Sequence, residues 1–327
     1  MTILDTQLLS AQNNDDLDRA LQILRRGGLV AVPTETVYGL AANAMNPHAV
    51  RSIFAAKGRP SNHPLIVHIA SSDQLKQWAV NIPPVAYVLA EHFWPGPLTI
   101  LLEKASNVPS EVTAGKDSIG LRVPAHPALL RLLQHGQIGV AAPSANPYKR
   151  LSPTSAAQVF AQMHGKIDAV LDGGACEVGL ESTIVDLSGD ELRVLRQGPI
   201  TAKQIAEVTG RRVVIPEHHT AAVPGNVAEH YQPHTPLFIG TREQMLAQLQ
   251  QEQEPIACVF YADTAGLPES ALITKLPKDK EAYAHGLYAT LYKLDCLQAS
   301  AIWLEQPPLL ENWGDVNDRL RRAATLL

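Results

Sequence analysis

The chain has 327 residues, of which 46% are hydrophobic, so it is long enough for two domains with a large buried core. Residues 1–212 carry 19 Lys and Arg against 18 Asp and Glu, whereas residues 213–327 carry 8 against 14. This balance excludes the broad basic surface that is typical of a nucleic-acid-binding protein. Cations that bind a ligand are therefore expected to act locally, in a pocket.

No run approaches the roughly 20 apolar residues of a membrane-spanning helix, and the first residues lack the basic start and apolar core of a signal peptide. We therefore expect a cytoplasmic protein with no membrane partner. Cys176, Cys258 and Cys296 are widely spaced, odd in number and form no C-x-x-C pair, which argues against both a zinc ribbon and a disulfide framework. All three are expected to be small buried hydrophobes.

Apolar periodicity bounded by Gly, Pro and capping residues predicts alternating helices and strands in the first two thirds of the chain. Asp15 and Asp16 are expected to cap the first helix, which ends at Gly27. Strands are expected at residues 29–32, 65–70, 98–102, 118–123, 138–142, 169–171, 183–186, 192–195 and 213–215. Further helices are expected at residues 47–57, 72–78, 84–93, 129–133 and 202–208, with another that begins near residue 155.

The most informative stretch is Lys57-Gly58-Arg59-Pro60, which ends the helix that Asn46 and Pro47 open. Gly58 fits the left-handed position that follows a helix, so Lys57 lies in the last turn. A lone lysine there would only complement the helix dipole. The donor-rich loop that follows, with Asn62 and His63, favours a binding site instead.

Two strand residues carry the same ambiguity. Arg122 lies in an apolar strand that ends at a proline, so it needs either an internal salt bridge or an anionic ligand such as a carboxylate or phosphate. His68 shares a strand face with Ile66 and Ala70, and alone it is more often a hydrogen-bonded core residue than a ligand.

Small polar residues and a further arginine follow other strands: Thr34 and Thr36 after the strand at 29–32, Ser144 and Asn146 after 138–142, Ser182 before 183–186, and Arg196 after 192–195. The chain has no Walker A motif, H-E-x-x-H, G-x-S-x-G or kinase signature. Cations with hydroxyl and amide groups suit a polyphosphate and a small carboxylate-bearing substrate. The residues alone thus predict a nucleotide-using enzyme with a carboxylate substrate, and nothing more specific.

Residues 216–236 have a loop composition, which suggests a lid or a functional linker. Their histidines, His218, His219, His230 and His234, match no standard zinc spacing, so we expect no metal held by protein side chains. Strands at 237–239, 257–261, 271–274 and 301–304, with helices between them such as 280–296, predict a small Rossmann-like domain.

Ordered motifs across the whole chain resemble the Sua5/YrdC family of threonylcarbamoyl-AMP synthases, in its long two-domain Sua5 form. They are P-T-E-T-V-Y-G-L (33–40), K-G-R-P-S-N-H-P-L-I-V-H (57–68), F-W-P-G-P-L-T (93–99), G-L-R-V-P (120–124), A-P-S-A-N (142–146), S-P-T (152–154), D-G-G (172–174), G-L-E-S-T-I-V-D (179–186), L-R-Q-G (195–198), P-G-x-x-x-x-H-Y-x-P (224–233) and L-Y-x-x-L-Y-x-L-D (287–295). The resemblance implies an α/β fold: a YrdC-like catalytic domain at 1–215 with a twisted, open, mixed sheet, a linker or lid at 216–236, and a Rossmann-like Sua5 domain at 237–327.

The resemblance also implies an activity: L-threonine, bicarbonate and ATP form L-threonylcarbamoyl-AMP and pyrophosphate. The product would pass to a tRNA threonylcarbamoyl-transfer complex that modifies adenosine 37, and a weak contact with tRNA is expected as well. Mg²⁺ would arrive with ATP. Lys57 and Arg59 would be catalytic, and Tyr231 would fold over the nucleotide as a lid. The implied ATP-binding residues are Lys57, Arg59, Asn62, His63, Ser118, Ser144, Asn146, Ser152, Arg196 and Tyr231. The implied threonine-binding residues are Thr36, His68, Arg122, Ala142 and Ser182.

Two other functions fit parts of the pattern. One is an RNA-binding YrdC-like module without chemistry, against which the near-neutral first domain argues. The other is a carbamoyl-transfer maturation enzyme that shares this domain, but such proteins carry Cys-rich zinc fingers and an acylphosphatase-like domain that are absent here. The second domain could also serve only to anchor and time the linker.

Overall fold

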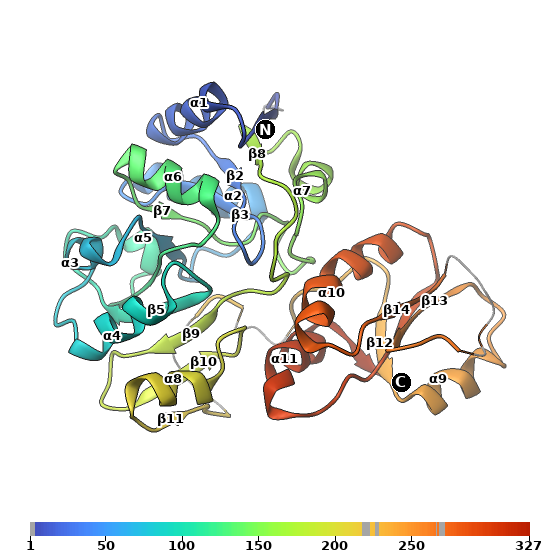
Figure 1. The fold of residues 1–327 in the computed structure, drawn as a ribbon. Helices are drawn as coiled ribbons and strands as arrows, with labels where there is room; N and C mark the ends of the chain where they lie inside the picture. Colours follow the sequence, from blue (N-terminus) through green and yellow to red (C-terminus); the bar gives the residue numbers. More distant parts are fainter. Residues whose placement is uncertain (1–3, 218–222, 226–228, 266, 268–271) are drawn as a thin grey trace. The chain divides into compact units, whose positions relative to one another are not determined.

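The computed structural model of the chain describes residues 4–217, 223–225, 229–265, 267 and 272–327 (Figure 1). Two compact units make up the chain. The first combines Met1–Tyr148, Pro153–Glu177 and Glu181–Asn226, and the second combines Lys149–Ser152, Val178–Leu180 and Val227–Leu327. Two short pieces of the earlier sequence thus pack with the second unit. Within the described ranges, no helix is long and apolar enough to cross a membrane.

The first unit is built on a mixed sheet of 11 strands. In spatial order these are β1 (Gln7–Ser10), β8 (Ala169–Asp172), β2 (Val30–Val32), β3 (Gly39–Asn43), β7 (Val140–Ala141), β4 (Ile66–His68), β6 (Ser118–Arg122), β5 (Leu98–Glu103), β9 (Thr183–Asp186), β10 (Leu192–Arg196) and β11 (Val213–Val214). The sheet combines parallel pairs such as β4–β6 and β5–β9 with antiparallel pairs such as β4–β7 and β5–β6. The expected mixed α/β fold is confirmed.

Helices pack on this sheet and fill two apolar cores. They are α1 (Asn14–Arg25), α2 (Pro47–Lys57), α3 (Leu75–Trp78), α4 (Pro84–Phe93), α5 (Ser110–Thr113), α6 (Pro127–Gly136), α7 (Ala156–Met163) and α8 (Ala202–Thr209). One core holds α2, α4 and the middle strands, and the other holds α1 and α6, which lie side by side in Figure 1. Complete burial of residues such as Ile53, Leu89 and Leu129 supplies the apolar free energy that holds the sheet and helices together.

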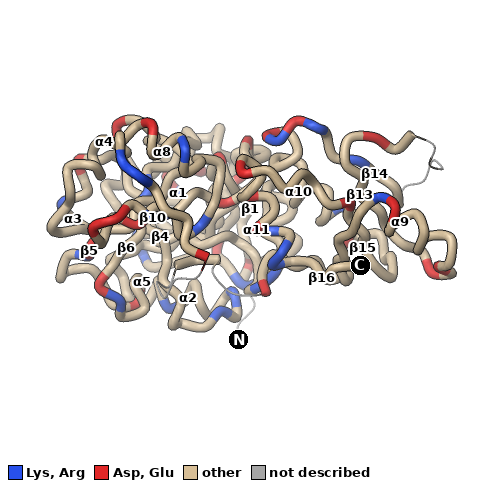
Figure 2. The backbone as a smooth tube through the Cα atoms, turned by 90° about the horizontal axis from the view of Figure 1, so that it is seen from below, with Lys and Arg blue, Asp and Glu red and all other residues tan. Residues whose placement is uncertain are grey.

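The second unit has a sheet of five strands in the order β14 (Ile273–Leu276), β13 (Ile256–Tyr261), β15 (Ala301–Glu305), β12 (Leu237–Gly240) and β16 (Thr325–Leu326). Among the residues of this unit that the structure describes, all four strand pairings are parallel, as expected for a Rossmann-like domain. Its helices are α9 (Arg242–Leu249), α10 (Lys280–Asp295) and α11 (Gly314–Ala323). Charges of both signs are interspersed along both units (Figure 2).

Several local expectations need correction. Asn13, not Asp15 or Asp16, caps α1: its side chain accepts a hydrogen bond from the Asp15 amide, and both aspartates lie in the first turn. Strands β1, β3 and β16 were not expected. β1 and β16 are short edge strands with little apolar signal, whereas β3 is a buried inner strand whose Gly, Ala and Asn residues have low β propensity. Cys176 and Cys258 are buried, but Cys296 is exposed, so the expectation for Cys296 is wrong. His218 and His219 lie outside the described residues.

Candidate active site

Helix α2 ends where the sequence predicted, and its end places Lys57 inside the protein. Asn46 caps its start with two amide hydrogen bonds, and Gly58 adopts the left-handed conformation at φ 63°. Lys57 is only 4% exposed, and its ammonium donates to the backbone carbonyls of Ser144 and Asn146. Lys57 therefore does more than complement the helix dipole, because it joins the helix end to the loop after β7.

Burial, and secondly the charge of Arg59, lower the pKa of Lys57 well below its ordinary value. An anion bound beside Lys57 would offset both effects, because its negative charge would stabilise the buried ammonium. The Arg59 guanidinium donates to the Pro64 carbonyl at 3.1 Å and lies 6.0 Å from the centre of the Phe54 ring. The loop after α2 thus holds a second cation near the first.

Two predicted residues of that loop differ in exposure. Asn62 is exposed, whereas His63 is half-buried and its ring lies 5.9 Å from the Tyr148 ring. Burial, followed by the nearby Arg59, lowers the pKa of His63. A neutral His63 has one ring nitrogen that accepts a hydrogen bond and one that donates. It therefore suits a neutral heterocycle or a hydroxyl better than a protonated His63, which only donates.

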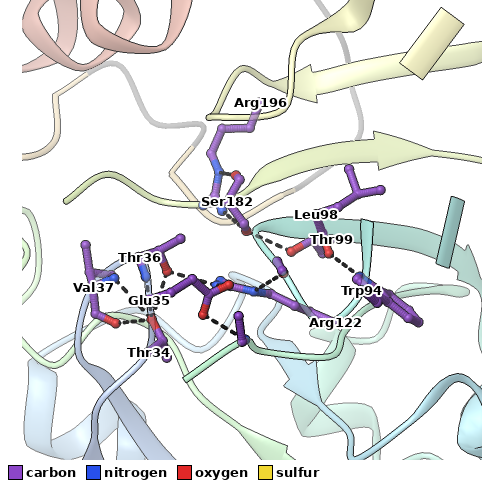
Figure 3. Close-up of polar contacts among 12 residues, drawn as sticks. Thr34, Glu35, Thr36, Val37, Trp94, Leu98, Thr99, Arg122, Ser182 and Arg196 are labelled. Atoms are coloured by element: carbon purple, nitrogen blue, oxygen red, sulfur yellow. Dashed lines mark hydrogen bonds and ion pairs between the residues drawn. The ribbon is translucent and has the colours of Figure 1, made fainter. Parts of the chain in front are cut away.

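Arg122 has an internal salt bridge, the structural alternative raised above. Its Nη2 lies 2.6 Å from Oε1 of Glu35, and it also donates to the Thr36 hydroxyl at 3.1 Å, while Nε donates to the Gly96 carbonyl (Figure 3). The second Glu35 oxygen accepts the amide hydrogen of Ala125. Both charged side chains are at most 5% exposed. Within the described residues, Nη1 of Arg122 has no hydrogen-bond partner, so part of the guanidinium remains available to a ligand.

His68 lies directly beside Arg122, because β4 and β6 pair in parallel with these two residues opposite each other. Its side chain is 3% exposed, and among the described residues its Nδ1 has no hydrogen-bond partner. Burial, and then the Arg122 charge, lower the pKa of His68 well below its ordinary value, so the imidazole is neutral at pH 7. A buried polar atom without a partner is costly, and a ligand that formed a hydrogen bond with Nδ1 would remove that cost.

Arg196 and Ser182 contact each other directly (Figure 3). The Arg196 guanidinium donates to both the carbonyl and the hydroxyl oxygen of Ser182, each at 2.9 Å, and Nη1 donates to the Pro224 carbonyl at 3.1 Å. A β-bulge between Val194 and Arg196 shifts the register of β10 against β9 just before Arg196. Gly198 is required as well, since a Cβ there would lie 2.3 Å from the Thr183 amide nitrogen.

The predicted residues do not line one edge of the sheet. His68 ends β4, whereas the amide of Ala142 bonds to the Ile66 carbonyl at the beginning of β4. Because β4 has only three residues, its two ends are about 7 Å apart. One ligand the size of an amino acid joined to a phosphate could therefore reach groups at both ends.

The remaining predicted residues lie as follows. Ala142 and Asn146 are buried, Ser118 and Ser144 are half-buried, and Gly39 pairs with Ser144 in an isolated bridge. Ser152 and Tyr231 belong to the second unit. The Tyr231 side chain is 1% exposed, stacks on Tyr288 of α10 with ring centres 5.9 Å apart, and lies 5.4 Å from the Arg319 guanidinium of α11.

Two residues in these hydrogen-bond networks were not predicted from the sequence. Glu35 lies within the P-T-E-T-V-Y-G motif, but the motif alone indicated no role for it, although a buried strand arginine requires an anionic partner. Thr99 is completely buried, and its hydroxyl lies 2.8 Å from that of Ser182. Thr99 is the last residue of the F-W-P-G-P-L-T motif (93–99), but threonine is an ordinary strand residue, so the motif alone indicated no role for it.

Comparison with known proteins relates these features to characterised families. Residues 22–198 match the family model Sua5_yciO_yrdC, described as telomere recombination, and residues 200–325 match the C-terminal domain of threonylcarbamoyl-AMP synthase. The chain is 37% identical to a threonylcarbamoyl-AMP synthase of Pyrococcus abyssi over 93% of each chain. It is 36% identical to that of Bacillus subtilis, over 95% of this chain and 94% of that one. The fold is similar to the crystal structure of P. abyssi Sua5 complexed with L-threonine, with a TM-score of 0.89 and 35% identity over 98% and 97% of the two chains.

Proposed function

The chain belongs to the Sua5/YrdC family in its two-domain form, and we infer that it is itself a threonylcarbamoyl-AMP synthase. The observation that carries this inference is the similarity to the threonine-bound P. abyssi structure over nearly the whole of both chains. The reaction converts L-threonine, bicarbonate and ATP into L-threonylcarbamoyl-AMP, pyrophosphate and water. L-threonylcarbamoyl-AMP is the activated intermediate for threonylcarbamoylation of adenosine 37 in tRNA.

We propose that threonine is held around Arg122. Nη1 of Arg122, which has no hydrogen-bond partner in the described part of the chain, suits the threonine carboxylate, with Thr36 beside it and neutral His68 next to it in register. Ser182 and the backbone of Ala142 complete the proposed set. In this environment the amine of threonine takes up carbon dioxide derived from bicarbonate, loses a proton and becomes a carbamate.

We propose that the triphosphate of ATP lies beside Lys57, Arg59 and Arg196. A carbamate oxygen attacks the α-phosphorus, the bond from that phosphorus to the bridging oxygen breaks, and pyrophosphate leaves. The three cations offset the charge that develops on the phosphate oxygens. Asn62, His63, Ser118, Ser144, Asn146 and Ser152 would position the nucleotide. Because the proposed phosphate-binding side chains are cations, Mg²⁺ would enter as the counter-ion of ATP.

The product is a labile mixed anhydride, so it must be protected from water and passed on. We propose a cytoplasmic location and transfer of the product to a tRNA threonylcarbamoyl-transfer complex, with at most a weak contact to tRNA itself. The nearly balanced charge of residues 1–212 agrees with this weak contact, since strong RNA affinity requires spread positive charge.

Mass spectrometry of the reaction mixture tests the function. The protein incubated with ATP–Mg²⁺, bicarbonate and L-threonine should yield a threonylcarbamoyl adenylate and stoichiometric pyrophosphate, with serine in equal amount as a competitor that is used less. An RNA-binding module without chemistry would instead bind tRNA in a salt-dependent manner and consume no ATP, which would refute the assignment.

Tyr231 is proposed to close over the nucleotide and exclude water. Replacement of Tyr231 by alanine should raise the amount of free AMP per threonylcarbamoyl product, because water would reach the adenylate. Tyr231→Phe keeps the ring and is the matched control. An unchanged AMP-to-product ratio in Tyr231→Ala, with the protein still folded by thermal unfolding, would count against a lid.

A further inference from the structure

Three polar side chains from separate segments of the first unit form a chain of hydrogen bonds (Figure 3). Thr99 lies on β5, Ser182 directly precedes β9, and Arg196 ends β10. The hydroxyl oxygens of Thr99 and Ser182 are 2.8 Å apart, and the Arg196 guanidinium lies 2.9 Å from the Ser182 hydroxyl. Exposure falls from 8% at Arg196 through 1% at Ser182 to zero at Thr99, so Thr99 is the buried end of this chain.

The backbone holds these three residues rigidly. Strands β5 and β9 pair in parallel with Leu98 opposite Thr183, which places Thr99 beside the segment that carries Ser182. The Thr183 hydroxyl both donates to the carbonyl and accepts from the amide of Ile200, so the chain after Arg196 is tied to the start of β9. With the backbone fixed, the orientation of the Ser182 hydroxyl depends on its hydrogen-bond partners.

Hydrogen-bond geometry makes Thr99 decisive for that orientation. The Ser182 oxygen already accepts a hydrogen bond from Arg196, and either hydroxyl of the Thr99–Ser182 pair can be the donor. If Ser182 donates to Thr99, its proton is occupied. If Thr99 donates instead, the Ser182 proton is released toward a ligand oxygen. Buried hydroxyls require partners, so the two residues exchange donor and acceptor roles together.

We propose that Thr99 is a positioning residue that links the two substrate subsites. This rests on the proposed function, in which Ser182 contacts threonine and Arg196 contacts the phosphates. Arg196 already donates to the Ser182 oxygen without ATP. A phosphate bound to Arg196 restrains the guanidinium in that position, and Thr99 then donates to the same oxygen, so the Ser182 proton is free for threonine. Binding of one substrate thereby orders the group that the other substrate uses, and by linkage the effect is reciprocal.

The experiment compares Thr99→Val with Thr99→Ser. Valine has nearly the shape of threonine but lacks the hydroxyl, whereas serine keeps it. Threonine binding is measured by calorimetry with and without a non-hydrolysable ATP analogue, and KM and kcat are measured for product formation. The analogue should increase threonine affinity in the unmodified protein. Thr99→Val should reduce that increase in threonine affinity by about 3- to 10-fold, the effect expected for one hydrogen bond. It should also raise the KM for threonine and the KM for ATP more than it lowers kcat. Thr99→Ser should restore the coupling.

Thr113→Val is the matched control, because Thr113 is also buried, and among the described residues its hydroxyl has no hydrogen-bond partner. It should leave coupling and KM unchanged. Unaltered coupling in Thr99→Val, or equal losses of coupling in the valine and serine variants, would overturn the proposed positioning role of Thr99. The proposed function would still hold if the unmodified protein formed the product. If the unmodified protein made no product, the proposed function and this inference would both fall.

Discussion

Replacement of Lys57 by methionine is expected to reduce formation of threonylcarbamoyl-AMP by roughly 10²- to 10³-fold, the loss seen when a preorganised group at the developing charge is removed. Methionine fills a similar volume but carries no charge. Lys57 ends α2, and its ammonium is buried against the carbonyl groups of Ser144 and Asn146, so no solvent cation can take its place. Initial rates of pyrophosphate release at saturating threonine measure the effect.

Lys76→Met provides the control for this prediction, because Lys76 is an exposed lysine on α3 and its loss should leave the rate unchanged. Circular dichroism and thermal unfolding verify that Lys57→Met retains the fold, since methionine leaves two carbonyl groups without their donor. A folded Lys57→Met protein with a rate within tenfold of the unmodified protein would refute a catalytic role for this residue.

Replacement of Arg122 by methionine is expected to abolish threonine binding and also to destabilise the first unit by about 3–5 kcal/mol. The loss of stability follows because Glu35 would be left as a buried carboxylate with no cation beside it. The loss of binding follows because the threonine carboxylate would lose its proposed partner. Calorimetry with threonine and denaturant unfolding measure the two effects separately.

The double variant Arg122→Met with Glu35→Gln separates the structural role of Arg122 from its binding role. Glutamine is neutral, so the double variant should recover most of the lost stability, whereas threonine affinity should stay lost. Threonine affinity equal to that of the unmodified protein in the double variant would mean that Arg122 is only a structural partner of Glu35.

Local sequence patterns determined much of the element structure. Asn46, Pro47 and Gly58 define both ends of α2 by capping and backbone conformation, which involve only neighbouring residues. The position of Lys57 in the last turn followed directly. Ordered motifs likewise identified the family before any tertiary contact was known. Such signals can be read from the sequence because their physical cause lies within a few residues.

Pairings between distant residues were decided only by the tertiary structure. Glu35 reaches Arg122 across 87 residues, and Lys57 reaches the Ser144 carbonyl across an equal separation. Which acid satisfies a buried arginine depends on strand order and register, and an 11-stranded mixed sheet offers many arrangements with equally apolar strands. The sequence by itself therefore determined the family, the chemical groups and most helices, whereas their partners came from long-range packing. The assignment of Ser152 and Tyr231 to the second unit has the same origin, because compact units form by contact in space, and order along the chain does not determine them.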